Sequence, residues 1–155
     1  MCGFVGYLGS RNPDIFSFDK ISHRGPDASS SLISDSLALS FHRLAINGLD
    51  IGSGQPMNIT VESLKRFWLV CNGEIYNYKR LAKKHGFEMQ TNSDCEIIIH
   101  MFERFGIEKT CKSLDGVFAF CIYDSKSGTL YSARDRYGVR PSFFGSTISG
   151  EYVVA

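Results

Sequence analysis

The order of apolar patterns along the chain is the feature that most limits its fold. Strand-like runs fill both ends of the 155-residue sequence, and two helix-like stretches lie between them. Consecutive strands joined by short Gly, Asp and Ser turns favour antiparallel pairing, whereas a parallel sheet needs a crossover between neighbouring strands. The pattern therefore predicts an α+β fold in which helices are layered against antiparallel sheets.

Local periodicity and turn signals give the expected elements. Two central helices are predicted: residues 76–85, stopped by Gly86, and a stronger helix that Asp94 caps and that continues to Gly106. A short helix is expected over residues 14–22. The predicted strands are residues 3–8, 30–34, 37–44, 67–71, 117–123, 129–133, 142–146 and 152–155.

Composition and charge exclude several classes of function. The net charge is +1 and basic residues alternate with acidic ones, so a nucleic-acid partner is not expected. The longest apolar run, residues 117–123, is too short to span a bilayer, and the first residues do not resemble a signal peptide. Residues 48–58 are rich in Gly, Ser and Pro and are predicted to be a loop inside the domain. We expect a cytoplasmic protein of one domain, with no membrane partner.

The cysteines fit neither a disulfide framework nor a zinc site. They form an odd set without a C-x-x-C pair: Cys2, Cys71, Cys95, Cys111 and Cys121. All except Cys2 have apolar or helical neighbours and are interpreted as small buried hydrophobes. Glu96, His100 and Glu103 share a helix face at a spacing that metals can use, but a solvated surface explains them and no metal is predicted.

Cys2 stands out because removal of Met1 makes it the amino-terminal residue. Initiator methionine is generally removed when a small residue such as cysteine follows. A free α-amine titrates near ~7.7 to 8.0, so part of it is neutral at physiological pH and can take the proton of its own thiol. Taken alone, a cysteine at position two can be incidental. Its place at the start of a predicted strand favours a rigidly held nucleophile.

A second feature of this kind is Asn72-Gly73, at the end of the predicted strand 67–71. The dipeptide predicts a turn, and taken alone it is most often a plain turn. An asparagine amide and a following glycine N–H are also suitable donors to a tetrahedral oxyanion. Together with Cys2, they indicate amide-bond chemistry.

Eight motifs in sequence order make this interpretation specific. They are M-C-G-F-V-G (residues 1–6), H-R-G-P-D (23–27), R-L-A-I (43–46), Q-P-M (55–57), N-G-E-I-Y-N (72–77), S-D-C-E (93–96), D-G-V-F-A-F (115–120) and R-D-R-Y-G-V-R-P (134–141). Together they resemble the class II glutamine amidotransferase domain of glutamine-hydrolysing asparagine synthetases, over essentially the whole of residues 1–155. The resemblance implies a four-layer αββα sandwich of the amino-terminal-nucleophile hydrolase type.

The resemblance also implies roles for individual residues. Cys2 attacks the glutamine carboxamide and forms a glutamyl thioester, while Asn72 and the Gly73 backbone make the oxyanion hole. Arg43 holds the α-carboxylate of glutamine and Asp94 its α-ammonium. Without the resemblance, Arg43 would be read as a surface charge and Asp94 as a helix cap. The remaining glutamine-binding residues that the resemblance implies are Leu44, Ala45, Ile46, Asn47 and Glu74.

Two departures from the family bear on function. After Arg43-Leu44 the family commonly has serine-isoleucine and then an apolar residue with aspartate, whereas this chain has Ala45, Ile46, Asn47 and Gly48. No S-G-G-x-D-S pyrophosphate loop is present, so ATP and Mg²⁺ belong to a synthetase domain or subunit that accepts the ammonia, and no cofactor is expected here. The alternatives are an amidotransferase domain serving another synthase and a non-catalytic glutamine-sensing or assembly module.

Overall fold

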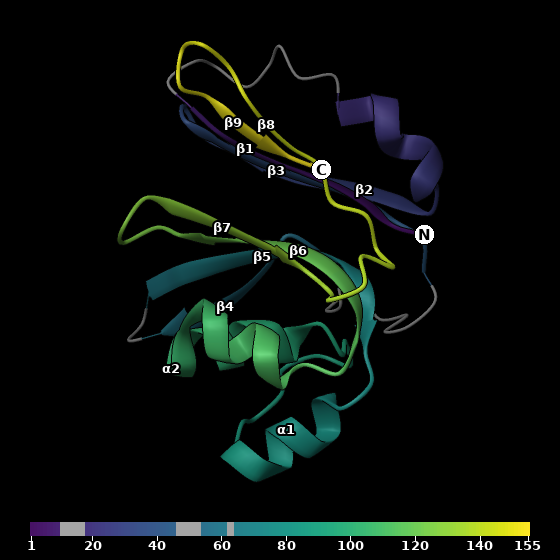
Figure 1. Cartoon of the computed structure of the whole chain (residues 1–155), viewed down its shortest axis with the longest axis vertical. Helices are drawn as coiled ribbons and strands as arrows, with labels where there is room; N and C mark the ends of the chain where they lie inside the picture. Colours follow the sequence, from purple (N-terminus) through teal and green to yellow (C-terminus); the bar gives the residue numbers. More distant parts are fainter. Residues whose placement is uncertain (10–17, 46–53, 62–63) are drawn as a thin grey trace.

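Two antiparallel sheets stacked face to face form the centre of the molecule (Figure 1). The computed structural model describes residues 1–9, 18–45, 54–61 and 64–155. One sheet has the order β2-β3-β1-β9-β8, and the other has the order β4-β5-β6-β7. The strands are β1 (Gly3–Leu8), β2 (Ala28–Ile33), β3 (Leu37–Arg43), β4 (Met57–Val61), β5 (Leu64–Ile75), β6 (Gly116–Asp124), β7 (Thr129–Arg134), β8 (Phe144–Ser146) and β9 (Tyr152–Val154).

Helices cover the outer faces of both sheets. The helices α1 (Tyr78–His85) and α2 (Glu96–Ser113) lie below the four-stranded sheet in Figure 1, with α2 packed on β4, β5 and β7. The 3-10 helix η2 (Phe18–Arg24) packs on β1 and β3 of the five-stranded sheet. The predicted α+β sandwich of two antiparallel sheets is confirmed. Among the described residues, η2 is the helix that covers the five-stranded sheet.

Side-chain alternation along β6 explains how the layers are held together. Phe118, Phe120 and Ile122 pack toward α2, whereas Ala119 and Cys121 pack between the two sheets. A strand that is buried on both faces reads as a continuous apolar run, and this is the pattern of residues 117–123. Burial raises the pKa of the Cys121 thiol to about 12, so this cysteine acts as a small hydrophobe, as predicted.

The predicted turn at Asn72-Gly73 is wrong. Both residues lie inside β5, where Asn72 is opposite Ala119 and Gly73 is opposite Phe118 of β6. An Asn-Gly turn requires the chain to reverse at once, but here the partner strand comes about forty residues later. Glycine is needed at 73 for a different reason, since a Cβ atom there would lie 2.5 Å from the Val117 carbonyl oxygen.

The ends of the central helices also differ from the predictions. Gly86 ends α1 in the left-handed conformation, as expected. The helix α2 continues past Gly106 to Ser113, and the non-helical backbone of Gly106 (φ 75°, ψ 172°) forms a kink between two helical segments. Asp94 is not the cap of α2, because Cys95 occupies that position and the Asp94 carboxylate bonds the Ile75 N–H instead.

Two smaller predictions are corrected in the same way. Met57 and Asn58 begin β4, so the predicted loop over residues 48–58 ends before them, and residues 48–53 lie outside the described part. Of the predicted helix over residues 14–22, the described part is the start of η2. No helix in the described ranges has both the length and the apolar character that crossing a membrane requires.

The face of α2 that carries Glu96 and His100 is not a solvated surface. Glu96 is 1% exposed, and its carboxylate lies 3.0 Å from His100 Nε2. The same carboxylate accepts hydrogen bonds from the Gln90 N–H and from both the N–H and the hydroxyl of Thr91. Glu96 therefore fixes the loop that leads into α2. Within the described residues, no three His, Cys, Asp or Glu side chains converge as metal ligands.

Candidate active site

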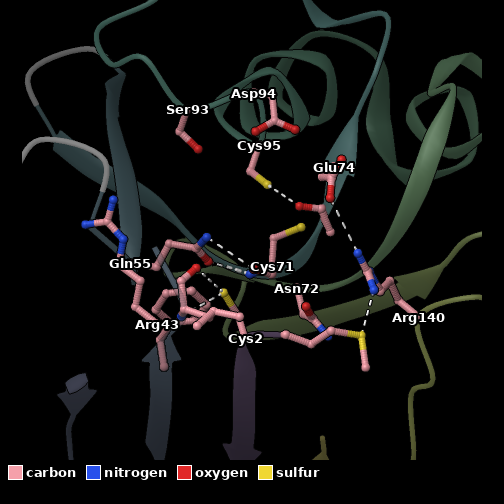
Figure 2. Close-up of a pocket in the computed structure, with 14 residues that line it drawn as sticks. Cys2, Arg43, Gln55, Cys71, Asn72, Glu74, Ser93, Asp94, Cys95 and Arg140 are labelled. Atoms are coloured by element: carbon pink, nitrogen blue, oxygen red, sulfur yellow. Dashed lines mark hydrogen bonds and ion pairs between the residues drawn. The ribbon is translucent and has the colours of Figure 1, made fainter. Parts of the chain in front are cut away.

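Cys2 lies immediately before β1, on the wall of an open pocket of about 560 Å³ (Figure 2). Its sulfur accepts a hydrogen bond from the Leu44 N–H at 3.3 Å and lies 3.5 Å from the Leu44 carbonyl oxygen. Arg24 Nε donates to the Cys2 carbonyl at 3.3 Å. The backbone and the thiol of Cys2 are thus both held by neighbouring elements.

The pocket contains most of the predicted site residues. The residues around it come from the segment before β1, the end of β3, the segment before β4, β5, the loop before α2 and the segment after β7. They are Met1, Cys2, Phe41, Arg43, Leu44, Gln55, Cys71, Asn72, Gly73, Glu74, Ser93, Asp94, Cys95 and Arg140.

One edge of β5 faces this pocket. Phe118 directs its N–H and its C=O toward Asp135, at 3.3 and 2.7 Å, and therefore away from β5. Gly73 and Phe118 are therefore opposite each other without exchanging hydrogen bonds. The N–H and C=O of Gly73 point to the edge of β5 that is turned away from β6. The last residue pair between β4 and β5 is Met57–Leu69. Beyond Leu69, this edge of β5 opens to the pocket.

Along this edge, where β4 no longer pairs with β5, side chains bond the backbone groups of β5 instead. The Gln55 amide pairs with both backbone groups of Cys71, and the Asp94 carboxylate accepts from the Ile75 N–H. Between them, the Gly73 carbonyl accepts from the Cys95 thiol at 3.8 Å. The described residues provide no hydrogen-bond partner for the Gly73 N–H. This N–H is therefore the group on the edge that is available to a ligand.

Three cysteines line the pocket, but they differ in reactivity. Cys95 is buried, and its hydrogen bond with Cys71 together with burial raises its thiol pKa well above the ordinary value. A thiol that stays protonated is a poor nucleophile. Cys71 is also buried, at 1% exposure, whereas Cys2 is only partly buried. Cys2 is therefore the cysteine that a ligand in the pocket can reach.

Charged groups of both signs line the rest of the pocket. Burial raises the pKa of the Asp94 carboxyl, the Ile75 N–H opposes the shift, and the charge of Glu74 adds to it. Glu74 lies 3.6 Å from the guanidinium of Arg140. Arg43 adds a second guanidinium, from the end of β3. A ligand that carries both an ammonium and a carboxylate matches such a lining.

The structure also shows which site predictions fall outside the pocket and which residues were missed. Ala45 does not line it, and its N–H donates to the Asp27 carboxylate at 2.7 Å. The predicted residues Ile46 and Asn47 lie outside the described part. Gln55 and Arg140 were not predicted as site residues, although each lies in a quoted motif, Q-P-M or R-D-R-Y-G-V-R-P.

Comparison with known proteins agrees with this geometry. The sequence model of the family described as "Glutamine amidotransferase domain" matches residues 1–155. Similar relatives include the glutamine-hydrolysing asparagine synthetases of Gallus gallus, 44% identical over 92% of this chain, and of Homo sapiens, 41% identical over 97%. A probable asparagine synthetase of Acanthamoeba polyphaga mimivirus is 39% identical over 94% of the chain. The chain spans only 26–28% of the length of these relatives.

A solved structure supports the fold. The structure of the allosteric regulatory enzyme of purine biosynthesis can be superimposed on this chain with a TM-score of 0.66 and 22% sequence identity. The superposition covers 97% of this chain and 35% of the chain of that enzyme. At this identity, the match concerns the architecture alone, and it confirms the sandwich expected of an amino-terminal-nucleophile hydrolase. Since the family match covers every residue, the chain belongs to the glutamine amidotransferase domain family.

Proposed function

We propose that this chain hydrolyses the side-chain amide of glutamine to glutamate and ammonia, with Cys2 as nucleophile once Met1 is removed. The observation that carries the proposal is that one pocket holds both the accessible Cys2 thiol and the Gly73 N–H, which has no hydrogen-bond partner among the described residues. An amide carbonyl between the two can be attacked on carbon while its oxygen receives a hydrogen bond. Relatives named as glutamine-hydrolysing asparagine synthetases support the choice of amide.

The proposed reaction begins with proton transfer from the Cys2 thiol to its own α-amine. The thiolate attacks the carboxamide carbon, a C–S bond forms, and the carbonyl electrons move to oxygen. The Gly73 N–H and the Asn72 side-chain amide donate to this oxyanion. The ammonium of Cys2 protonates the leaving nitrogen, ammonia departs, and water then hydrolyses the thioester with the amine again acting as base.

The Leu44 N–H has a part in the first step. It donates to the Cys2 sulfur at 3.3 Å, and a hydrogen bond to sulfur is stronger when the sulfur carries negative charge. This bond holds the sulfur in place and so fixes the direction of attack. Leu44 was predicted to bind glutamine; the contact proposed here is a different one, from its backbone N–H to the nucleophile.

The amino-acid end of glutamine pairs with the charged lining. Arg43 receives the α-carboxylate, because a planar guanidinium can bond both oxygens. Asp94, with Glu74 beside it, receives the α-ammonium. The α-ammonium of bound glutamine offsets the effect of burial, which disfavours the ionised form of Asp94. The affinity for glutamine is therefore linked to the charge of the Asp94 carboxyl.

We further propose that the ammonia serves asparagine synthesis in a synthetase domain or subunit outside this segment. The relatives bear that name, and the chain spans about a quarter of their length. ATP and Mg²⁺ chemistry belongs to that part, so we expect no cofactor in this domain. A cytoplasmic location is consistent with this role.

Ammonia release from glutamine tests the proposal. The chain is incubated with glutamine after mass spectrometry has verified that it starts at Cys2, and ammonia and glutamate are measured in parallel. Equal amounts of both products are expected. Glutamine binding without ammonia release would refute the enzyme and favour a glutamine-sensing module.

A further inference from the structure

Gln55 is a buried residue in the pocket wall to which the proposed mechanism gives no role. It is 7% exposed, and both ends of its side-chain amide contact the Cys71 backbone (Figure 2). We propose that Gln55 is a positioning residue that fixes the oxyanion-binding segment of β5. This inference rests on the proposed glutamine hydrolysis and adds a residue to it.

The first step of the argument is that Gln55 continues a β-ladder that the backbone cannot continue. Pairing between β4 and β5 ends at Met57–Leu69, and the preceding Pro56 has no N–H to donate. The next residue of β5 whose backbone N–H and C=O point to this edge is Cys71. Gln55 Nε2 donates to the Cys71 carbonyl at 3.2 Å, and Gln55 Oε1 accepts from the Cys71 N–H at 2.5 Å. A primary amide thus replaces a peptide group.

The second step concerns what these bonds hold in place. Cys71 precedes Asn72 and is two residues before Gly73, the two proposed oxyanion donors. On the other side of Gly73, the Asp94 carboxylate holds the Ile75 N–H. Gly73 therefore lies between two anchored peptides on the same strand edge. Its N–H keeps its direction while remaining unpartnered among the described residues.

The third step is that Gln55 connects the two sheets beside the pocket. The Ser30 hydroxyl of β2 donates to the Gln55 backbone carbonyl, while the Gln55 side chain bonds β5. Cys2 leads directly into β1 of the sheet that contains β2, and Asn72 and Gly73 belong to the other sheet. Gln55 thus helps to set the distance between the nucleophile and the oxyanion donors.

The consequence for kinetics is specific. The oxyanion exists only in the transition state and the tetrahedral intermediate, so misplaced donors lower kcat more than they weaken substrate binding. In the proposed mechanism, ground-state binding depends on the charged amino-acid end of glutamine, which pairs with Arg43 and Asp94 and not with Gln55. Loss of the Gln55 amide should therefore reduce kcat while leaving KM nearly unchanged.

The test compares Gln55→Met, which removes both bonds, with Ile59→Val as the matched control. Ile59 is a buried residue of β4, the strand that follows Gln55, and in the described structure it is opposite Phe67 and forms no hydrogen bond with Cys71 or Gly73. For Gln55→Met we expect kcat to fall by about 10- to 100-fold, less than the ~10²- to 10³-fold loss on removal of an oxyanion donor because the donors are misplaced and not removed, with KM within about threefold. Ile59→Val should keep kcat within about twofold.

A tetrahedral adduct separates positioning from general damage. Glutamate γ-semialdehyde reacts with the thiolate to form a thiohemiacetal whose oxygen occupies the oxyanion site. Its inhibition constant should rise with the loss of kcat in Gln55→Met, whereas binding of the product glutamate should not change. Equal weakening of both ligands, or an unchanged kcat in a folded variant, would overturn the inference.

If Gln55→Met does not fold, Gln55→Glu provides a second test of the same inference. A carboxylate accepts from the Cys71 N–H but cannot donate to its carbonyl, whereas the protonated acid can do both. The activity of Gln55→Glu relative to wild type should therefore rise as the pH falls. A pH-independent ratio would contradict the inference. Absence of ammonia release from the wild type would refute the proposed function, and this role with it.

Discussion

The sulfur of Cys2 lies 3.3 Å from the backbone nitrogen of Leu44, at the point where β3 ends beside the start of β1. This contact joins two antiparallel neighbours, since Gly3 is opposite His42 in the sheet. Cys2, the proposed nucleophile, is therefore placed by the register of a sheet and not by a loop. Its position should survive removal of its own reactive atom.

Replacement of Cys2 by alanine is the first prediction. Cys2→Ala should reduce ammonia release by at least about three orders of magnitude, because no other group in the pocket replaces a covalent nucleophile. Glutamine binding, measured by calorimetry, should remain within a few-fold, because Arg43 and Asp94 are unchanged. Wild-type turnover in this variant would remove Cys2 from the mechanism.

Retention of Met1 is the second prediction. A peptide bond at Cys2 converts its basic amine into an amide that cannot take a proton. The Met1 side chain also lines the pocket, with its sulfur 2.6 Å from Arg140 Nη1. Chains that retain Met1 should release no ammonia, and treatment with a methionine aminopeptidase should restore activity. Comparable activity of both forms would refute the amine as base.

The fold was accessible from the sequence, because its signals are local. An apolar, aromatic-rich run at β1 and alternation along β3 predicted strands, and Gly86 predicted the end of α1. The exposed edge of β5 was not accessible in this way. Whether Asn72-Gly73 forms a turn or stays extended depends on β6, which lies far along the chain. Only the paired structure shows that the Gly73 N–H faces the pocket.

Asp94 and Gln55 illustrate a second limit of sequence analysis. Asp94 precedes a helix, so local rules predicted a cap, yet its carboxylate bonds Ile75 on another element. Gln55 lies in a segment rich in Gly and Pro that predicted only a loop. Its amide has a partner because β5 extends beyond β4. Contacts that complete the edge of another strand leave no periodic signal.

Asp94→Asn is the third prediction, and its effects on stability and on binding should have opposite signs. The pKa of the Asp94 carboxyl is raised, so the folded state binds the proton more tightly than the unfolded state does. Stability from this group is present below the unfolded pKa, near ~3.9, and is lost as pH rises through the raised folded value. At pH 7, Asp94→Asn should melt at an equal or higher temperature, since the asparagine oxygen can still accept from the Ile75 N–H.

Its effect on glutamine should be a loss. An uncharged side chain cannot form the charge-assisted bond to the α-ammonium, so KM should rise roughly tenfold or more. Asp94→Ala serves as the control, because it also removes the acceptor for Ile75 and should lower the melting temperature. If Asp94→Asn keeps the wild-type KM, Asp94 does not bind the amino group.

Glu96→Gln is the fourth prediction, and it concerns the loop that presents Ser93 and Asp94 to the pocket. Burial alone would raise the pKa of the Glu96 carboxyl, but hydrogen bonds from His100, Thr91 and Gln90 together lower it. A lowered folded pKa means that this stabilisation is present above the unfolded value, near ~4.3, and is lost as pH falls through the folded value.

At pH 7, Glu96→Gln should reduce the free energy of unfolding by about 2–3 kcal/mol, because an amide cannot accept from all of these donors. The deficit should shrink as pH falls below the unfolded value and through the lowered folded pKa of Glu96. Glu108→Gln is the matched control on the same helix: its partner Lys112 is exposed, so urea titrations should show no change in midpoint. A deficit that persists unchanged at low pH would show that packing, and not the carboxylate network, holds this loop.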